Sequence, residues 1–364
     1  MYADDAGGSG DNTLTVWTWD PNFNVYAIEK AAEIYAQDHE GFKVEVTEVL
    51  SDDIETNLTT AASAGDYSTL PDIFLMQDNS FQKYVTNYPD IFTDLTDSGV
   101  DFSQFAEAKV AYSVVDGKNY GVPFDNGAVI AAYRMDYLEQ AGFTIDDFTD
   151  ITWSDFMEKA KVVKEKTGQP ILTSQAGSPD LIMEMLQSCG ASLFNEDGSV
   201  NIVGNDALKE CMEIQSGKWA ITNMPRLERQ ENATNYSNNG GSSWAISSNC
   251  DNPELAMDFL NATFAGSTEL YDDLLTAGTG AIATWSPAKE SDVYAEPSEF
   301  FGGDAVNSKI LGFSEQTPSN VTGPFYYDAR NAVGTALSAI TQQGADMDSE
   351  IEKAQDTVEF NMGG

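Results

Sequence analysis

Four short segments place aromatic side chains beside amides and carboxylates where turns are expected. A carbohydrate has apolar C–H faces and a rim of hydroxyl groups that both donate and accept hydrogen bonds, so aromatic rings next to planar carboxylates and amides suit it. Any single segment is explained equally well as core aromatics beside turn residues, but four together favour a carbohydrate site. The segments are Trp17, Trp19, Asp20, Asn22, Phe23 and Asn24; Phe124-Asp125-Asn126; Asn235-Tyr236-Ser237-Asn238-Asn239; and Phe325-Tyr326-Tyr327-Asp328.

Carboxylates within these segments leave a hydrolytic alternative open. Asp20 and Asp125 lie in two of the segments, and Asp78 follows an expected strand. A glycoside hydrolase needs one carboxylic acid of raised pKa and a second carboxylate at a set separation. Sequence spacing does not give that separation, so a hydrolase using two of these three aspartates remains the alternative to a binding protein.

Metal, nucleotide and cofactor chemistry find no support in the sequence. The chain has one histidine, His39, and three widely spaced cysteines, Cys189, Cys211 and Cys250, with no HExxH or CxxC pattern. Zinc sites need clusters of these residues. Glycine-rich phosphate loops are also missing. We expect His39 to be a solvated residue at a helix end and the cysteines to be small buried residues, with one disulfide pair left open.

The segment Asn195-Glu196-Asp197-Gly198-Ser199 resembles the start of a calcium loop. The bidentate glutamate that such a loop needs does not follow at the required distance. Asp-Gly between two short extended pieces is typical of a hairpin turn, which is the interpretation we prefer.

The composition excludes polyanionic partners. The chain has 364 residues with 18 basic and 59 acidic side chains, giving a formal net charge of −41. Binding to nucleic acid requires clustered Lys and Arg, and an anionic membrane surface would repel this chain in the same way. A length of this order suits two lobes better than one core, and 41% apolar residues indicate a folded protein.

Strands and helices alternate at the start of the chain. Strands are expected at residues 14–19, 42–49 and 73–76, with helices at 26–37 and 52–64 between them. This βαβ alternation predicts an open α/β sheet, in which ligands lie beyond the carboxyl ends of the strands. Residues 1–12, rich in Gly, Ser and Asp, are expected to be a flexible tether. Further helices are expected at residues 154–167, 253–264, 329–340 and 349–360.

Nearly the whole chain resembles extracellular solute-binding protein family 1, the sugar-binding receptors of ABC importers related to maltose-binding protein. The resemblance is carried by an ordered set of segments. They are LTVWTWD from Leu14, TTAASAGDYSTLPDIFLMQD ending at Asp78, YGVPFDNGAVIAAYRMDYLEQAGF from Tyr120, ITWSDFMEKAKVVKEKTG, NYSNNGGSSWAISSNCDNPELAMDFLNATF and FYYDARNAVGTALSAI with DMDSEIEKAQ.

The resemblance implies an α/β, two-lobed periplasmic-binding-protein-like fold. Each lobe is expected to be an open sheet flanked by helices, with a ligand cleft between the lobes. Three hinge crossings are expected near Phe124, Ala245 and Trp285. The N-terminal lobe would then be residues 13–124 plus 246–284, and the C-terminal lobe 125–245 plus 285–364.

The resemblance also implies ligand-binding positions. Positions matching family sites are Asp20, Asn22, Asp78, Asp125, Asn126, Tyr236, Asn238 and Tyr326. Chemistry and location add Trp19, Phe23, Asn24, Phe124 and Trp285.

The expected function is that of an extracytoplasmic receptor, not an enzyme, that delivers an oligosaccharide to an ABC transporter by hinge closure around it. Its partners would be the sugar and the permease subunits, and we expect a monomer without a cofactor. Xylo-type, plant-derived sugars are slightly favoured over malto- or galacto-oligosaccharides, and a non-sugar solute stays open. A surface lipoprotein of the Gram-positive type and a periplasmic protein are both compatible with the resemblance.

One departure from the family lies between Gln215 and Ser216. Family members carry some tens of further residues there, including a helix, a strand and often a sugar-stacking Trp of the second lobe. Either this lobe is trimmed, or part of the natural chain is absent from this sequence. We favour the second explanation because loss of a sheet strand would expose core.

Overall fold

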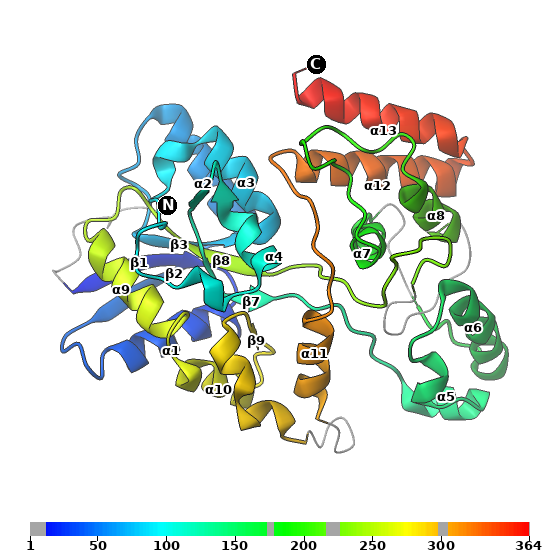
Figure 1. Ribbon diagram of the computed structural model, residues 1–364, viewed down its shortest axis with the longest axis horizontal. Coiled ribbons are helices and arrows are strands. Elements are labelled where there is room, and N and C mark those ends of the chain that lie inside the picture. The colour runs from blue at the N-terminus through cyan, green and yellow to red at the C-terminus, as the bar shows by residue number, and fades with distance from the viewer. Residues whose placement is uncertain (1–11, 173–177, 216–225, 298–304, 364) are drawn as a thin grey trace. The chain divides into compact units, whose positions relative to one another are not determined.

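A computed structural model describes residues 12–172, 178–215, 226–297 and 305–363, and the chain divides into two units (Figure 1). Unit 1 comprises Met1–Asn126 and Gly240–Lys309, and unit 2 comprises Gly127–Asn239 and Ile310–Gly364. The chain therefore crosses between the units three times, at 126/127, 239/240 and 309/310. Of the expected tether, residues 1–11 lie outside the described residues.

The later crossings differ from the expected boundaries because two strands belong to unit 1. The strand β8 (Ser242–Ile246) pairs with β3 (Ile73–Gln77), so the second crossing precedes it instead of falling near Ala245. The strand β9 (Ile282–Ala283) pairs with β7 (Asp125–Asn126), so the chain stays in unit 1 well beyond Trp285. The first crossing lies two residues after Phe124.

Unit 1 contains a five-stranded sheet of order β2-β1-β3-β8-β6. The strand β1 (Thr13–Thr18) runs parallel to β2 (Lys43–Glu48) and to β3, whereas β8 runs antiparallel to β3 and to β6 (Val122–Pro123). Alternate residues of β1 are buried, while four successive apolar residues of β3 are buried, as a central strand requires. The strands β4 (Val114–Val115) and β5 (Lys118–Asn119) form a separate hairpin.

Helices cover both faces of this sheet (Figure 1). On one side α1 contacts both α9 and α10, and on the other α2 and α3 contact β3. The apolar side of α1 buries Ala27, Ile28, Ala31 and Ala32, the spacing that directs one helical face inward. The helices of unit 1 are α1 (Asn24–Tyr35), α2 (Ser51–Ala64), α3 (Asp78–Asn87), α4 (Glu107–Val110), α9 (Pro253–Thr263) and α10 (Thr268–Thr276); α11 (Val306–Ser314) spans the third crossing.

Short 3-10 segments complete the described regular structure. They are η1 (Pro89–Ile91), η2 (Phe102–Gln104), η3 (Ala111–Ser113), η4 (Ile145–Phe148), η5 (Ser286–Glu290) and η6 (Asp292–Ala295).

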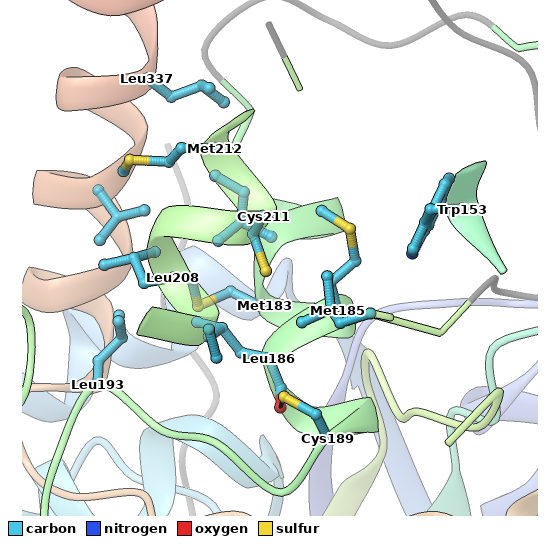
Figure 2. Packing of buried hydrophobic residues seen from close by; sticks show 14 of the residues in the cluster. Trp153, Met183, Met185, Leu186, Cys189, Leu193, Leu208, Cys211, Met212 and Leu337 are labelled. Carbon is cyan, nitrogen blue, oxygen red and sulfur yellow. Dashed lines mark hydrogen bonds between the residues drawn. The ribbon is translucent and has the colours of Figure 1, made fainter. Parts of the chain in front are cut away.

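Unit 2 has a helical core. Figure 2 shows Met183 and Leu186 of α7 near Cys211 and Met212 of α8, in a buried cluster that also includes Leu337 of α12. The helices α12 and α13 lie side by side (Figure 1). The helices of this unit are α5 (Met135–Ala141), α6 (Trp153–Thr167), α7 (Asp180–Ser188), α8 (Asp206–Gln215), α12 (Tyr326–Gln343) and α13 (Met347–Asn361).

The sheet expected in the second lobe is not found in the described part of unit 2. Isolated bridges join Ala128 to Asn238, Thr152 to Arg226 and Phe194 to Val200 there, but these residues form no strand. Residues 216–225, next to the position where a departure from the family is expected, lie outside the described residues. The two-lobed α/β architecture is confirmed, whereas a sheet in each lobe is not.

The cysteines, His39 and the turn at residues 195–199 can be compared with what the sequence predicted. The three cysteines are free and buried, and His39 is exposed just after α1, stacked on Tyr35 with ring centroids 3.7 Å apart. The Asn195 amide donates to the Ser199 carbonyl at 2.8 Å, which confirms the turn. Within the described residues, no helix combines the length and apolar character needed to cross a membrane.

Candidate functional site

Several predicted residues meet at one edge of the unit 1 sheet. Because β1 and β3 are parallel, and both β3 and β6 are antiparallel to β8, the carboxyl ends of β1, β3 and β6 lie at the edge where β8 begins. Ligands of open α/β sheets bind beyond this edge. We call it the carboxyl edge of unit 1; its residues are Trp19, Asp20, Asn22, Phe23, Asn24, Asp78, Phe124, Asp125, Asn126, Gly241 and Ser242.

Asn24 holds the turn after β1 in place. Its side chain is fully buried, and its Oδ1 accepts hydrogen bonds from Thr18 Oγ1 at 2.6 Å, the Trp19 amide at 3.1 Å and the Asp20 amide at 2.9 Å. The Asp20 carboxylate in turn accepts from the Asn22 amide at 2.9 Å. Asn22 is exposed, and Trp19 and Asp20 are partly exposed. Asn24 therefore supports the turn from inside, and its neighbours present their side chains at the surface.

A buried ionic cluster lies beside this turn. Asp78, Lys109 and Asp125 are 2%, 5% and 7% exposed. Lys109 Nζ lies 2.5 Å from Asp78 Oδ2 and donates to the Ser242 carbonyl at 2.9 Å. Ser243 Oγ donates to Asp78 Oδ1 at 3.0 Å, and the Ser242 amide donates to Asp125 Oδ1 at 2.8 Å. Both predicted carboxylates thus have partners inside unit 1.

Burial governs the protonation of these two acids. It raises the pKa of Asp125 to about 6, with Lys109 opposing the rise and Asp78 adding to it. Burial also raises the pKa of the Asp78 carboxyl, against the lowering effect of Lys109 and of the Ser243 hydroxyl. Asp78 is bonded to Lys109, and Asp125 lies within the field of the same lysine. Both acids are buried instead of flanking an open site, which is not the arrangement that glycoside hydrolysis uses.

Gly241 allows this packing. Its φ is +96°, and a Cβ there would lie 2.6 Å from Asp78 Oδ2 and 3.0 Å from the Asp125 carbonyl oxygen. The amide of Asp78 also donates to the Gly241 carbonyl at 3.1 Å. A residue without a side chain is therefore required where the chain enters β8.

The aromatic candidates of unit 1 divide into two groups. Phe124 is fully buried, with its ring centroid 5.2 Å from Phe264 and 5.5 Å from Phe23, and Trp285 is 8% exposed with its Nε1 donating to Gln104 Oε1 at 2.7 Å. Phe23 and Trp19 keep exposed surface. Trp19 packs on one side against the buried cluster that includes Leu58 and Phe74, and the remaining exposed surface of Trp19 and Phe23 is where a sugar could stack.

In unit 2, two predicted residues lie in the segment that leads to the second crossing. Tyr236 is partly exposed, with its ring centroid 5.5 Å from that of Phe313. The Asn238 amide donates to Gln187 Oε1 at 2.8 Å, which ties this segment to α7. Tyr326 begins α12 and is 8% exposed.

Sequence reasoning missed the polar side of α7. Asp180, Glu184 and Gln187 follow one another at helical spacing; Asp180 pairs with Arg330, and Glu184 Oε1 accepts from Asn239 Nδ2 at 3.1 Å. Burial raises the pKa of Glu184 to about 7, and the nearby Asp180 adds to the rise. The spacing of four and three residues was the available signal for this group.

Lys109 and Gln104 were missed as well, because a lysine and a glutamine in polar stretches are typical of exposed positions. No group of three or more His, Cys, Asp or Glu side chains that could hold a metal ion occurs in the described parts of the chain.

Comparison with known proteins gives consistent similarities. A family model described as bacterial extracellular solute-binding protein matches residues 30–214. A lactose-binding protein from Rhizobium radiobacter is 36% identical over 389 aligned positions, which cover 94% of this chain and 91% of that protein. This aligned length exceeds the 364 residues here, so that relative has positions without a counterpart in this chain.

Solved structures with a similar fold agree. A crystal structure of an extracellular solute-binding protein of family 1 has a TM-score of 0.76 at 17% identity, over 95% of this chain and 98% of that one. A binding protein associated with an ABC transporter of B. animalis subsp. lactis Bl-04, in complex with β-1,6-galactobiose, has a TM-score of 0.72 at 19% identity, over 95% and 96% of the two chains.

Proposed function

Because this chain belongs to the bacterial extracellular solute-binding proteins, we propose that it is a sugar receptor that delivers an oligosaccharide to the permease subunits of an ABC importer. The observation that carries the proposal is the turn after β1. There Trp19, Asp20 and Asn22 present an aromatic ring, a carboxylate and an amide at the carboxyl edge of unit 1, held from inside by Asn24. These are the groups that a neutral, hydroxyl-rich ligand needs.

We propose galactosides as the first ligand class to test. Support comes from the lactose-binding relative, which is 36% identical over nearly the whole chain. The xylo-type preference expected from the sequence gains no support from the relatives, so xylo- and malto-oligosaccharides become comparison ligands.

We also propose that the bound sugar leaves unchanged. Asp78 and Asp125 are both buried; Asp78 is bonded to Lys109, and Asp125 accepts a hydrogen bond from the Ser242 amide. A hydrolase would need one of them to protonate a glycosidic oxygen and its partner to face water or the sugar ring. The observed arrangement favours a structural role for both acids.

The motion and location of the protein form part of the same proposal. A sugar that makes contacts with both units would favour a closed form, with hinges at the three chain crossings. We place this protein outside the cytoplasm, as a periplasmic protein or a surface lipoprotein, and acting as a monomer.

A ligand screen tests the function. The melting temperature would be measured with lactose, galacto-, xylo- and malto-oligosaccharides and arginine as a non-sugar solute, and each mixture would then be analysed by chromatography. A ligand that binds only the folded state raises the melting temperature. We expect a rise with a galactoside and an intact sugar afterwards. Shortened sugar would show an enzyme, and a rise with arginine alone would show a non-sugar receptor.

A further inference from the structure

In the described part of the chain, the ammonium group of Lys109 makes its hydrogen bonds within unit 1, at the carboxyl edge. It is 5% exposed, and its ammonium group bonds Asp78 Oδ2 and the Ser242 carbonyl. We propose that Lys109 is a positioning residue of the ligand-binding edge: it holds Asp125 and the Gly241–Ser242 backbone in place without contacting the ligand. The effect on sugar binding rests on the proposed function, whereas the effect on Asp125 does not.

The place of this cluster in the chain explains why its geometry matters. Asp125 precedes Asn126, the last residue of unit 1 before the first crossing, and Gly241 and Ser242 are the second and third residues after the second crossing. The Ser242 amide binds the Asp125 carboxylate, and the Phe124 amide donates to the Ser242 carbonyl at 3.1 Å. Lys109 binds the same carbonyl, so one ammonium group fixes both connecting segments where they leave unit 1.

The positive charge of Lys109 offsets the negative charges of two acids that are buried beside it. The charge of Asp78 raises the pKa of Asp125, and the burial of each acid disfavours its ionised form. Among the described residues, the titratable groups that interact with Asp125 are Lys109 on α4, Asp78 at the start of α3 and the Tyr271 hydroxyl on α10. The strand β8 contributes the backbone amide and the side chain of Ser242. With Lys109 removed, two buried carboxylates lack a cation, and a buried acid without a partner takes up a proton.

Proton linkage measures this role without any sugar. The unfolding free energy would be measured from pH 4 to pH 8 for the natural sequence and for each variant named below, once with Asp125 present and once with Asp125→Asn added. For each pair, the difference in unfolding free energy is plotted against pH, and the midpoint of this curve reports the ionisation of Asp125. We expect Lys109→Met to move the midpoint up by about one pH unit or more, and Asp78→Asn to move it down. Lys353→Met removes an exposed lysine of unit 2 and is the control for net charge; its midpoint should equal that of the natural sequence.

Two further variants keep the test informative if Lys109→Met prevents folding. The double variant Asp78→Asn/Lys109→Met removes the ion pair as a unit and should shift the midpoint upward by less than Lys109→Met alone. Lys109→Arg keeps the positive charge and should return the midpoint toward that of the natural sequence. Midpoints that agree within about 0.3 pH units for Lys109→Met, Asp78→Asn and the double variant would overturn the proposal, since a nearby charge must move them further.

Sugar binding supplies the second readout, with lactose as the probe. At pH 7 we expect Lys109→Met to lower lactose affinity at least about tenfold relative to Lys353→Met, a difference of about 1.4 kcal/mol. Equal affinities would contradict the positioning role. If the natural sequence does not bind lactose, the proposed ligand class fails, and the shifted midpoints still decide whether Lys109 controls Asp125.

Discussion

The carboxylate of Asp125 accepts a hydrogen bond from the backbone amide of Ser242, 117 residues further along the chain, at 2.8 Å. This bond joins the segment that leaves unit 1 at the first crossing to the segment that returns at the second. An aspartate predicted to touch the ligand thus has a partner in its own unit.

Gly241→Ala should destabilise unit 1 because the new Cβ would meet Asp78 Oδ2 at 2.6 Å as well as adopt a positive φ. We expect a loss of unfolding free energy of about 1–3 kcal/mol beyond that of the control Gly117→Ala. Gly117 has φ of +76° and no atom within 4 Å of its would-be Cβ, so it carries the backbone strain alone. Urea unfolding measures both variants; equal losses would contradict the packing described for Gly241.

Asn24→Ala should weaken folding because three donors lose their common acceptor at once. The expected loss is about 1–3 kcal/mol of unfolding free energy. Asn22→Ala is the matched control, because Asn22 is exposed and an exposed substitution changes stability by about 0.5 kcal/mol or less. If both variants unfold at the same urea concentration, Asn24 does not hold the turn.

Asp20→Asn and Asn22→Ala should lower sugar affinity while the protein stays folded. Asn at position 20 can still accept the hydrogen bond from the Asn22 amide, so the turn is preserved while the charge is lost. Loss of hydrogen bonds to a sugar hydroxyl corresponds to about 1.5–3 kcal/mol, or roughly 10- to 100-fold in affinity. Titration with the sugar found in the screen, beside the exposed control Asn87→Ala, measures the effect. Unchanged affinity in both variants would remove this turn from the site.

Glu184→Gln should change how stability depends on pH. Because the pKa of Glu184 is raised from 4.5 to about 7 in the folded protein, the folded state binds the extra proton between these values. Its contribution to the unfolding free energy therefore falls as pH rises from 4.5 to 7 and stays low above 7. The glutamine variant should lack this fall and be more stable than the natural sequence above pH 7 by up to roughly 3 kcal/mol.

Chemical unfolding at pH 4, 6 and 8 tests that difference, with the exposed Glu139→Gln as control. A difference between the Glu184→Gln variant and the natural sequence that stays constant across these pH values would show that Glu184 titrates at its ordinary value.

The sequence predicted unit 1 well because its elements depend on local patterns. Alternation in β1, the buried apolar run of β3 and the helical spacing of Ala27, Ile28 and Ala31 are visible in one short stretch each. The rule that ligands bind beyond strand carboxyl ends then led to the turn after β1. The boundaries at the second and third crossings were missed because pairing of β8 with β3, and of β9 with β7, joins residues far apart in the chain.

For the same reason, the exposure of the predicted site residues could be predicted only in part. Residue type indicated which groups suit a sugar, but whether a group faces solvent depends on partners that are distant in sequence. Asp78 is occupied by Lys109, 31 residues later, and Trp285 by Gln104, 181 residues earlier. No local pattern shows that these side chains already have partners.

Isothermal titration with lactose at pH 7, followed by chromatography of the recovered sugar, tests the central claim most directly. We expect saturable heat with one sugar per chain, a dissociation constant in the micromolar range (about −8 kcal/mol) and intact lactose afterwards. We also expect a clear loss of affinity in Asn22→Ala. Galactose and glucose in the recovered solution would contradict the receptor function. The absence of heat with lactose and with every other oligosaccharide of the screen would contradict sugar binding itself.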